Sequence, residues 1–233
     1  MSSASKARPE YAVRSSELSN RGASGGKFIT LEGGEGAGKS TQQKLLVAAL
    51  TRAGKEAIAT REPGGAKGAD EIRALLLNGA AERWDPISEA LLMVAARRRH
   101  LLETVWPALD AGKFVVSDRF ADSTMAYQGY GGGLDLAHLA ELHRLIAEDF
   151  APDLTLIFDV PVETGLARAA KRHGGEARFE GKGRDYHERV RQGFLAIAKA
   201  EPKRCVVIDA SRDIEAVSAA TLQAVRERLA ILA

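Results

Sequence analysis

The chain has 233 residues, of which 45% are hydrophobic and 27% are charged, and its formal net charge is +2. This composition is ordinary for a globular protein, and the length suits one large domain with a substantial core. The small net charge excludes bulk attraction to nucleic acid or to a membrane surface, so any anion site must be local. The single cysteine, Cys205, cannot form an intrachain disulfide, which favours a reducing compartment, and we expect a cytoplasmic protein.

The N-terminus is the first feature along the chain. Residues 1–26 contain no apolar core of the kind that a secretory signal needs, and we expect them to form a disordered extension. Residues 27–233 are expected to form one domain. No apolar run approaches the roughly 18 residues that a membrane-spanning helix requires, so we expect no membrane partner.

Short runs rich in Val, Ile and Phe alternate along this domain with segments of helical pattern. The expected strands are residues 27–32, 55–60, 113–118, 153–159 and 204–209. The expected helices lie near residues 39–53, 68–78, 86–110, 121–129, 135–149, 161–172, 185–200 and 212–231. This alternation predicts an α/β fold, a three-layer sandwich with a five-stranded parallel sheet and helices on both faces. Ligands of such sheets bind beyond the carboxyl ends of the strands.

The first expected strand runs into a glycine-rich stretch, LEGGEGAGKST. The stretch matches the pattern G-x-x-x-x-G-K-[ST] between a strand and a helix, which predicts a phosphate-binding loop of the P-loop NTPase type. Bare glycines let backbone N–H groups approach a phosphate at a helix N-terminus, where the dipole favours negative charge. Lys39 would reach the β- and γ-phosphates, and the Ser40 hydroxyl would ligate Mg²⁺. The residues predicted to bind the triphosphate are Gly33, Gly34, Glu35, Gly36, Ala37, Gly38, Lys39, Ser40 and Thr41.

Two classes of P-loop protein then compete, a switch that hydrolyses the triphosphate and a kinase that passes the γ-phosphoryl group to a second substrate. A GTPase should carry an N-K-x-D element, which this sequence lacks. A kinase needs a second phosphate site, and Arg61 and Arg119 stand at strand ends where arginine forks could grip an acceptor phosphate. Asp118 stays open between a Mg²⁺-shell carboxylate and a carboxylate that orients one of these arginines.

A kinase also needs a basic cover that excludes water. Residues 168–191 hold eight Lys or Arg against four Asp or Glu around a glycine-bearing loop, and we expect a lid at about residues 168–188. Arginines of such a segment can neutralise the charge that develops on the transferred group. Arg189 and Arg191 are expected on a solvated helix face. The arginines expected to act on phosphate are Arg168, Arg172 and Arg178.

The sequence resembles the thymidylate kinase family in its bacterial form through five ordered motifs: FITLEGGEGAGKST, TREPGG, LLMVAARRRH, SDRFADSTMAYQG and FDVPVETGLARAAKR. The resemblance covers residue 27 to the C-terminus. It implies phosphorylation of dTMP to dTDP with ATP and Mg²⁺, for dTTP synthesis, by a homodimer. The P-loop interior carries no basic residue, as in the subgroup that supplies catalytic arginines from the lid. The implied catalytic residues are Lys39, Arg119, Arg168, Arg172 and Arg178, and the implied metal ligands are Ser40 and Asp118.

The resemblance also implies a dTMP site, whose residues can be matched one by one to positions of this sequence. Glu35 matches the residue that contacts the sugar 3′-hydroxyl, although the loop alone would also allow a place in the Mg²⁺ shell. Arg97 matches the arginine that hydrogen-bonds the thymine carbonyl, whereas Arg98 and Arg99 are expected in solvent. Met93 stands where the family commonly stacks a phenylalanine on the base, and it could equally be core. The implied dTMP-binding residues are Glu35, Arg61, Met93, Arg97, Arg119, Ser123, Thr124, Tyr127 and Gln128.

Other positions complete the interpretation. Tyr127 matches the tyrosine packed against the deoxyribose, where its ring would obstruct a 2′-hydroxyl. Phe120 replaces a Tyr or His, so a hydrogen bond from that position is absent, and Asp159 and the five histidines are expected to be structural or exposed. The surplus of apolar residues on the expected helices at 86–110 and 135–149 fits packing on the sheet or on a second subunit. The alternatives are another nucleoside monophosphate or deoxynucleoside kinase, and a nucleotide-binding protein that transfers no phosphate.

Overall fold

The computed structural model describes residues 25–79, 83–171 and 182–231. Most of the expected N-terminal extension and much of the expected lid, including Arg172 and Arg178, lie outside the described residues. None of the described helices combines the length and the apolar character that a membrane span requires.

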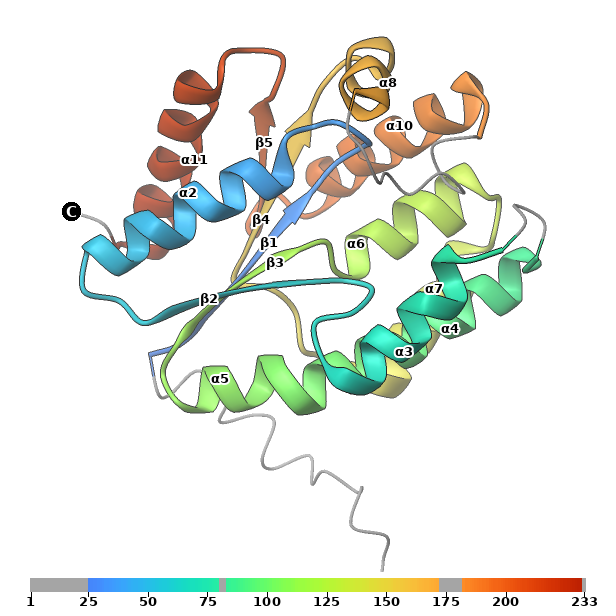
Figure 1. The fold of residues 1–233 in the computed structure, drawn as a ribbon, viewed down its shortest axis with the longest axis horizontal. Helices are drawn as coiled ribbons and strands as arrows, with labels where there is room; N and C mark the ends of the chain where they lie inside the picture. Colours follow the sequence, from blue (N-terminus) through green and yellow to red (C-terminus); the bar gives the residue numbers. More distant parts are fainter. Residues whose placement is uncertain (1–24, 80–82, 172–181, 232–233) are drawn as a thin grey trace, which may run out of the picture.

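Five parallel strands form the central sheet in the order β2-β3-β1-β4-β5 (Figure 1). β1 (Lys27–Glu32) occupies the centre, between β3 (Phe114–Asp118) and β4 (Leu154–Asp159). β2 (Ala57–Arg61) and β5 (Cys205–Asp209) form the two edges. The chain runs from β1 to the edge strand β2, returns to β3 beside β1, and then crosses to β4 on the other side of β1. The direction of winding therefore reverses beside β1, where ligands of open α/β sheets bind.

Two helices cover one face of the sheet, as Figure 1 shows. They are α2 (Lys39–Arg52), which follows β1, and α11 (Ile214–Leu229), which follows β5. Alternate residues of the strands face these helices because successive side chains of a strand point to opposite sides. This half of the core includes Ile29, Leu31, Leu46, Leu50, Phe114, Leu156, Phe158 and Val225.

The opposite face carries the remaining helices except α8 (Val162–Ala170), which follows β4 beside the loop at the end of β1. Its core joins Phe28, Val115 and Ile157 of the strands to the aromatic side chains of Trp106, Phe120 and Phe194. The helices of this face are α3 (Lys67–Leu77), α4 (Pro86–His100), α5 (Trp106–Asp110), α6 (Ala121–Thr124), α7 (Leu136–Ala147) and α10 (Arg184–Ala200), with π-helical turns η1 (Leu101–Val105) and η2 (Met125–Gly131).

The structure confirms the expected α/β sandwich, and each expected strand is present with ends shifted by no more than two residues. The helix expected over residues 86–110 is a continuous run of α4, η1 and α5. Cys205 is buried in β5, and burial raises the pKa of its thiol to about 11.

The expectation of a solvated helix face is confirmed for Arg189, which is exposed, but was wrong for Arg191, which is only partly exposed. Arg191 donates from Nε and Nη2 to the two carboxylate oxygens of Asp159, at 2.7 and 2.9 Å. Arg189 donates from Nη2 to the carbonyl of Gly131 at 2.9 Å. Both contacts arise because α10 packs between β4 and η2. Asp159 is therefore structural, as expected.

A close backbone approach fixes the loop between β1 and α2. Gly36 has φ +66°, and a Cβ built on it would collide with the backbone of Gly165 in α8. A Cβ on Gly165 would in turn collide with the carbonyl oxygen of Glu35. The absence of side chains at Gly36 and Gly165 lets α8 pack directly against the loop.

Gly165→Ala should destabilise the protein although alanine is intrinsically the better helix former by about 0.5–1 kcal/mol. The new Cβ must displace the Glu35 carbonyl, and such overpacking costs about 1–3 kcal/mol. For a chain of this size the corresponding fall in Tm is roughly 2–10 °C, measurable by differential scanning calorimetry.

Gly183→Ala is the matched control, because a Cβ at Gly183 meets nothing within 4 Å. Its Tm should fall less than that of Gly165→Ala, because the change creates no collision and only replaces the glycine N-cap of α10 by the less favoured alanine. An unchanged or raised Tm for Gly165→Ala would show that α8 can move away from the loop at no cost.

Candidate active site

The glycine-rich loop at the end of β1 already has the shape of an anion cradle. Gly36 and Gly38 have φ values of +66° and +86°, which side chains would disfavour. The ammonium of Lys39 donates to the carbonyls of Gly33 and Gly34 at 3.0 and 2.9 Å. Burial and the positive charge of Arg119 lower the pKa of Lys39. A phosphate placed in the loop would meet this ammonium at close range.

An oxygen-rich position lies beside the loop, where β3 ends. Ser40 Oγ donates to Asp118 Oδ2 at 2.9 Å. Asp118 Oδ1 is buried and has no hydrogen-bond partner in the described part of the chain. A carboxylate and a hydroxyl suit Mg²⁺, a hard cation that keeps several waters and completes its shell with substrate phosphates. The described residues hold no cluster of three or more His, Cys, Asp or Glu side chains suited to a metal.

Arg119 links the loop to the helices on the opposite face. Its Nη1 donates to Gly33 O at 3.0 Å and Ser123 Oγ at 3.2 Å. Its Nη2 donates to Glu35 Oε1 at 2.7 Å and Tyr127 Oη at 2.9 Å. The guanidinium also lies over the Tyr127 ring, 4.7 Å from its centroid. One side chain thus touches both predicted substrate sites.

A pocket opens next to Arg119 between β1, α4 and the α6–η2 segment. Eight of the nine residues predicted for the acceptor line it together with Glu62, Pro63 and Phe120. The eight are Glu35, Met93, Arg97, Arg119, Ser123, Thr124, Tyr127 and Gln128. Met93 is partly buried against the neighbouring apolar cluster, so the structure shows both the packing and the pocket contact that the sequence left open.

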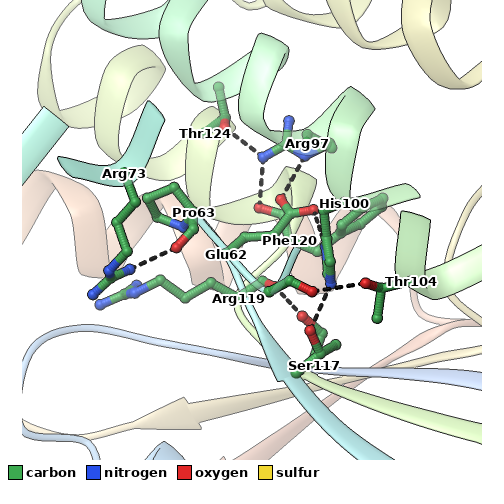
Figure 2. A network of polar contacts seen from close by, with 12 residues as sticks. Glu62, Pro63, Arg73, Arg97, His100, Thr104, Ser117, Arg119, Phe120 and Thr124 are labelled. Atoms are coloured by element: carbon green, nitrogen blue, oxygen red, sulfur yellow. Dashed lines mark hydrogen bonds and ion pairs between the residues drawn. The ribbon is translucent and has the colours of Figure 1, made fainter. Parts of the chain in front are cut away.

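Arg97 lies on the floor of this pocket with only 2% of its surface exposed. Its Nε donates to Glu62 Oε2 at 2.8 Å, and its Nη2 donates to Thr124 Oγ1 at 2.8 Å and Phe120 O at 3.1 Å (Figure 2). The neighbouring arginines differ from it. Arg99 is exposed, as expected. Arg98 was also expected in solvent, but it is partly buried and donates to Ile146 O at 2.6 Å.

Arg61, the ninth predicted residue, lines a second and larger cleft of about 880 Å³ together with Lys39, Asp118 and Arg119. Its guanidinium is half exposed and donates to Asp70 Oδ1 at 3.1 Å. Arg73 lines the same cleft, and its Nη1 donates to Pro63 O at 2.7 Å. Arg73 could not be predicted from the sequence, because a lone arginine within a helical pattern carries no local signal.

Arg168 is the one described arginine of the three predicted for the lid. Its Nη1 and Nη2 donate to the carbonyls of Ala210 and Ser211 at 2.8 and 3.3 Å. It also lines the large cleft, at the end formed by the β5–α11 connection. Its role in catalysis stays a prediction.

Glu32 is a buried carboxylate that the motif did not single out. Its oxygens accept from Phe120 N at 2.8 Å and Ser123 Oγ at 2.6 Å. Burial and the charge of Asp122 raise the pKa of Glu32 to about 7, against the lowering effect of the Ser123 hydrogen bond. Ser123 therefore bridges Glu32 and Arg119 rather than standing alone on the pocket wall.

Known proteins share these features over most of the chain. The family model described as thymidylate kinase matches residues 31–221. The thymidylate kinase of Caulobacter vibrioides is 54% identical over 206 residues, which cover 88% of this chain and 99% of that protein. The thymidylate kinase of Gluconobacter oxydans is 51% identical over 211 residues, with 88% and 97% coverage.

A solved structure agrees with the sequence comparisons. The crystal structure of thymidylate kinase from Ehrlichia chaffeensis superposes with a TM-score of 0.71 at 35% identity, and it covers 85% of this chain and 98% of its own. The family match, the curated relatives and this structure together show that the chain belongs to the thymidylate kinase family.

Proposed function

We propose that this chain transfers the γ-phosphoryl group of ATP to the phosphate of dTMP, so that ADP and dTDP form and the product serves dTTP synthesis. The observation that carries the proposal is the position of Arg119, whose guanidinium contacts the P-loop and the acceptor pocket at once. A kinase needs that arrangement because its two phosphates must meet in line.

On the donor side, the P-loop N–H groups and Lys39 hold the triphosphate. The ammonium exchanges its contacts with the Gly33 and Gly34 carbonyls for phosphate oxygens. Ser40 and Asp118 would hold Mg²⁺, which would neutralise negative charge on the phosphates when it is bound. The proposed lid at about residues 168–188 contributes Arg168, Arg172 and Arg178 to the same task.

On the acceptor side, Arg119 binds the dTMP phosphate with help from Arg61 and Arg73, which line the same cleft. Arg97 and Thr124 bind the thymine edge, and Gln128 stands beside them, held by Glu89 at 2.9 Å. Met93 packs on the base in place of an aromatic ring.

The sugar meets two further residues of the pocket. Tyr127 donates to Glu35 Oε1 at 2.7 Å, which supports a role for its ring against the deoxyribose and for the Glu35 carboxylate near the 3′-hydroxyl. A 2′-hydroxyl would collide with that ring, so the geometry favours deoxynucleotides.

The transfer needs no general base, because the acceptor is a phosphate oxygen that is largely ionised at neutral pH. The chain's own contribution is positioning and charge neutralisation by Lys39, Arg119 and the lid arginines. The described histidines support this interpretation. His100 is fully buried in a structural network, and His143, whose pKa burial lowers to about 4, donates from Nε2 to the Phe150 carbonyl at 3.3 Å.

We place the protein in the cytoplasm as a homodimer. A buried free thiol at Cys205 suits a reducing compartment. Helices α4 and α7 pack together and carry exposed apolar side chains, Ile87 at 61%, Leu91 at 48% and Leu145 at 80% exposure. A second copy of the chain would cover them.

Lys39→Ala should lower kcat for dTMP phosphorylation by about a hundredfold or more, because it removes a charged donor from the reacting phosphates. A coupled ADP-release assay with ATP and Mg²⁺ against dTMP, dUMP, dCMP, AMP, GMP and thymidine measures this loss and the acceptor preference together. Lys44→Ala, on the exposed side of α2, should leave the rate unchanged.

Preference of the wild type for another acceptor would contradict the base-site roles of Met93, Arg97, Thr124 and Tyr127. Absence of any acceptor-dependent turnover would instead favour a binding protein that transfers no phosphate.

Asp118→Asn should raise the Mg²⁺ concentration needed for half-maximal activity by about tenfold or more, because it weakens one of the few protein ligands. A Mg²⁺ titration at saturating ATP and dTMP measures the shift. Asp153→Asn is the control. Asp153 directly precedes β4, at the end of the sheet opposite Asp118, and accepts a hydrogen bond from Lys27 at 2.8 Å. Equal Mg²⁺ requirements for the wild type and Asp118→Asn would remove Asp118 from the metal site.

Leu91→Glu combined with Leu145→Glu should convert the dimer into monomers, because two charges would be buried at the interface. Sedimentation velocity measures the change in mass. Leu45→Glu, on the exposed part of α2, should remain dimeric. A monomeric wild type, or a variant that stays dimeric, would exclude α4 and α7 as the interface.

A further inference from the structure

One nitrogen of Arg97 remains for a substrate. Nε is engaged by Glu62, and Nη2 by Thr124 and the Phe120 carbonyl. Nη1 has no protein partner among the described residues, and Arg97 lines the acceptor pocket. The direction in which Nη1 points is thus fixed by what holds the other two nitrogens.

Glu62 is itself held from its other side, as Figure 2 shows. Its Oε1 lies 2.9 Å from Nδ1 of His100, while its Oε2 accepts from Arg97. The second ring nitrogen of His100, Nε2, lies 2.7 Å from Thr60 Oγ1. The side chains of Glu62 and Arg97 are 4% and 3% exposed and that of His100 is fully buried, so water does not compete for these contacts.

The charge state of Glu62 supports a fixed geometry. Burial alone would raise the pKa of Glu62, but the charge of Arg97, together with the hydrogen bond and charge of His100, lowers it. The carboxylate is therefore ionised at neutral pH and pairs with the guanidinium. A charge-assisted pair in a dry site is directional, and loss of one partner leaves the other unpaired.

We propose that Glu62, oriented by His100, is a positioning residue that aims Nη1 of Arg97 at the pyrimidine and so sets the preference for thymine over cytosine. The proposal deepens the proposed function and rests on it. A guanidinium can only donate hydrogen bonds. It can therefore pair with the 4-carbonyl oxygen of thymine but not with the 4-amino group of cytosine, which is also a donor. The discrimination between thymine and cytosine then depends on how rigidly Glu62 holds Nη1 in position.

Two substitutions of His100 distinguish a role in orienting Glu62 from a role in packing alone. In His100→Asn the amide nitrogen takes the place of Nδ1, so the contact with Glu62 can persist while that with Thr60 is lost. In His100→Gln the amide takes the place of Nε2, so the contact with Thr60 can persist while that with Glu62 is lost. Both variants remove the same ring, which makes each the control for the other. Glu62→Gln removes the charge directly.

The experiment measures kcat and KM for dTMP, KM for ATP, the ratio of kcat/KM for dTMP over dCMP, and Tm, for the wild type and all three variants. We expect Glu62→Gln and His100→Gln to raise KM for dTMP by about tenfold, the loss of one charge-assisted contact, with kcat and KM for ATP changed less than about threefold. The dTMP-over-dCMP ratio should fall in the same two variants. His100→Asn should keep the larger share of that ratio.

Equal behaviour of His100→Asn and His100→Gln would overturn the proposal, because it would show that only the ring matters. A rise in KM for ATP equal to that for dTMP, or an unchanged dTMP-over-dCMP ratio in Glu62→Gln, would overturn it as well. If Glu62→Gln does not fold, the two His100 variants decide alone. A wild type that does not phosphorylate dTMP would refute the proposed function itself, and this result is visible before any variant is compared.

Discussion

The guanidinium of Arg119 is the contact on which the arrangement of the site depends. It donates to Gly33 and Glu35 in the P-loop and to Ser123 and Tyr127 on the opposite side of the cleft. Hydrogen bonds to a charged group contribute about 1.5–3 kcal/mol each, so neither side can shift without a measurable loss. The backbone of Arg119 has φ +71°, a conformation that costs a non-glycine residue about 1–3 kcal/mol. The contacts of its side chain offset that cost.

Charged groups buried around Arg119 come in compensating sets. Lys39 lies among the carboxylates of Asp118, Glu35 and Glu32, and Arg97 pairs with Glu62. An isolated charge in such a setting would be strongly destabilising, so the sheet end tolerates these groups only because their partners are fixed. Fixed charges in a dry cleft are also what stabilises a transferring phosphoryl group, since they need no reorganisation during the reaction.

The sequence was sufficient wherever the signal was local. The alternation of strand and helix patterns predicted the sheet, and the glycine pattern predicted the P-loop. Arg119 was predicted because it directly follows an expected strand. Other residues depend on partners far along the chain. Arg191 carries the pattern of a solvated helix, yet it pairs with Asp159, 32 positions away. Glu62 was seen only as part of a motif, because its partners Arg97 and His100 are supplied by the packing of α4 against β2.

Both substrate sites are formed by contacts within the chain. Positive φ values at Gly36 and Gly38 and the close approach of α8 at Gly165 fix the shape of the P-loop. On the acceptor side, Glu62 holds Arg97 in the same way. Side chains that are ordered in advance lose little entropy on binding, so more of the binding free energy remains for alignment of the two phosphates. The arginines of the proposed lid would act differently, because a group that excludes water has to arrive after the substrates do. The proposal therefore assigns selectivity for the base to the rigid part of the molecule and leaves control of the transfer to the proposed lid.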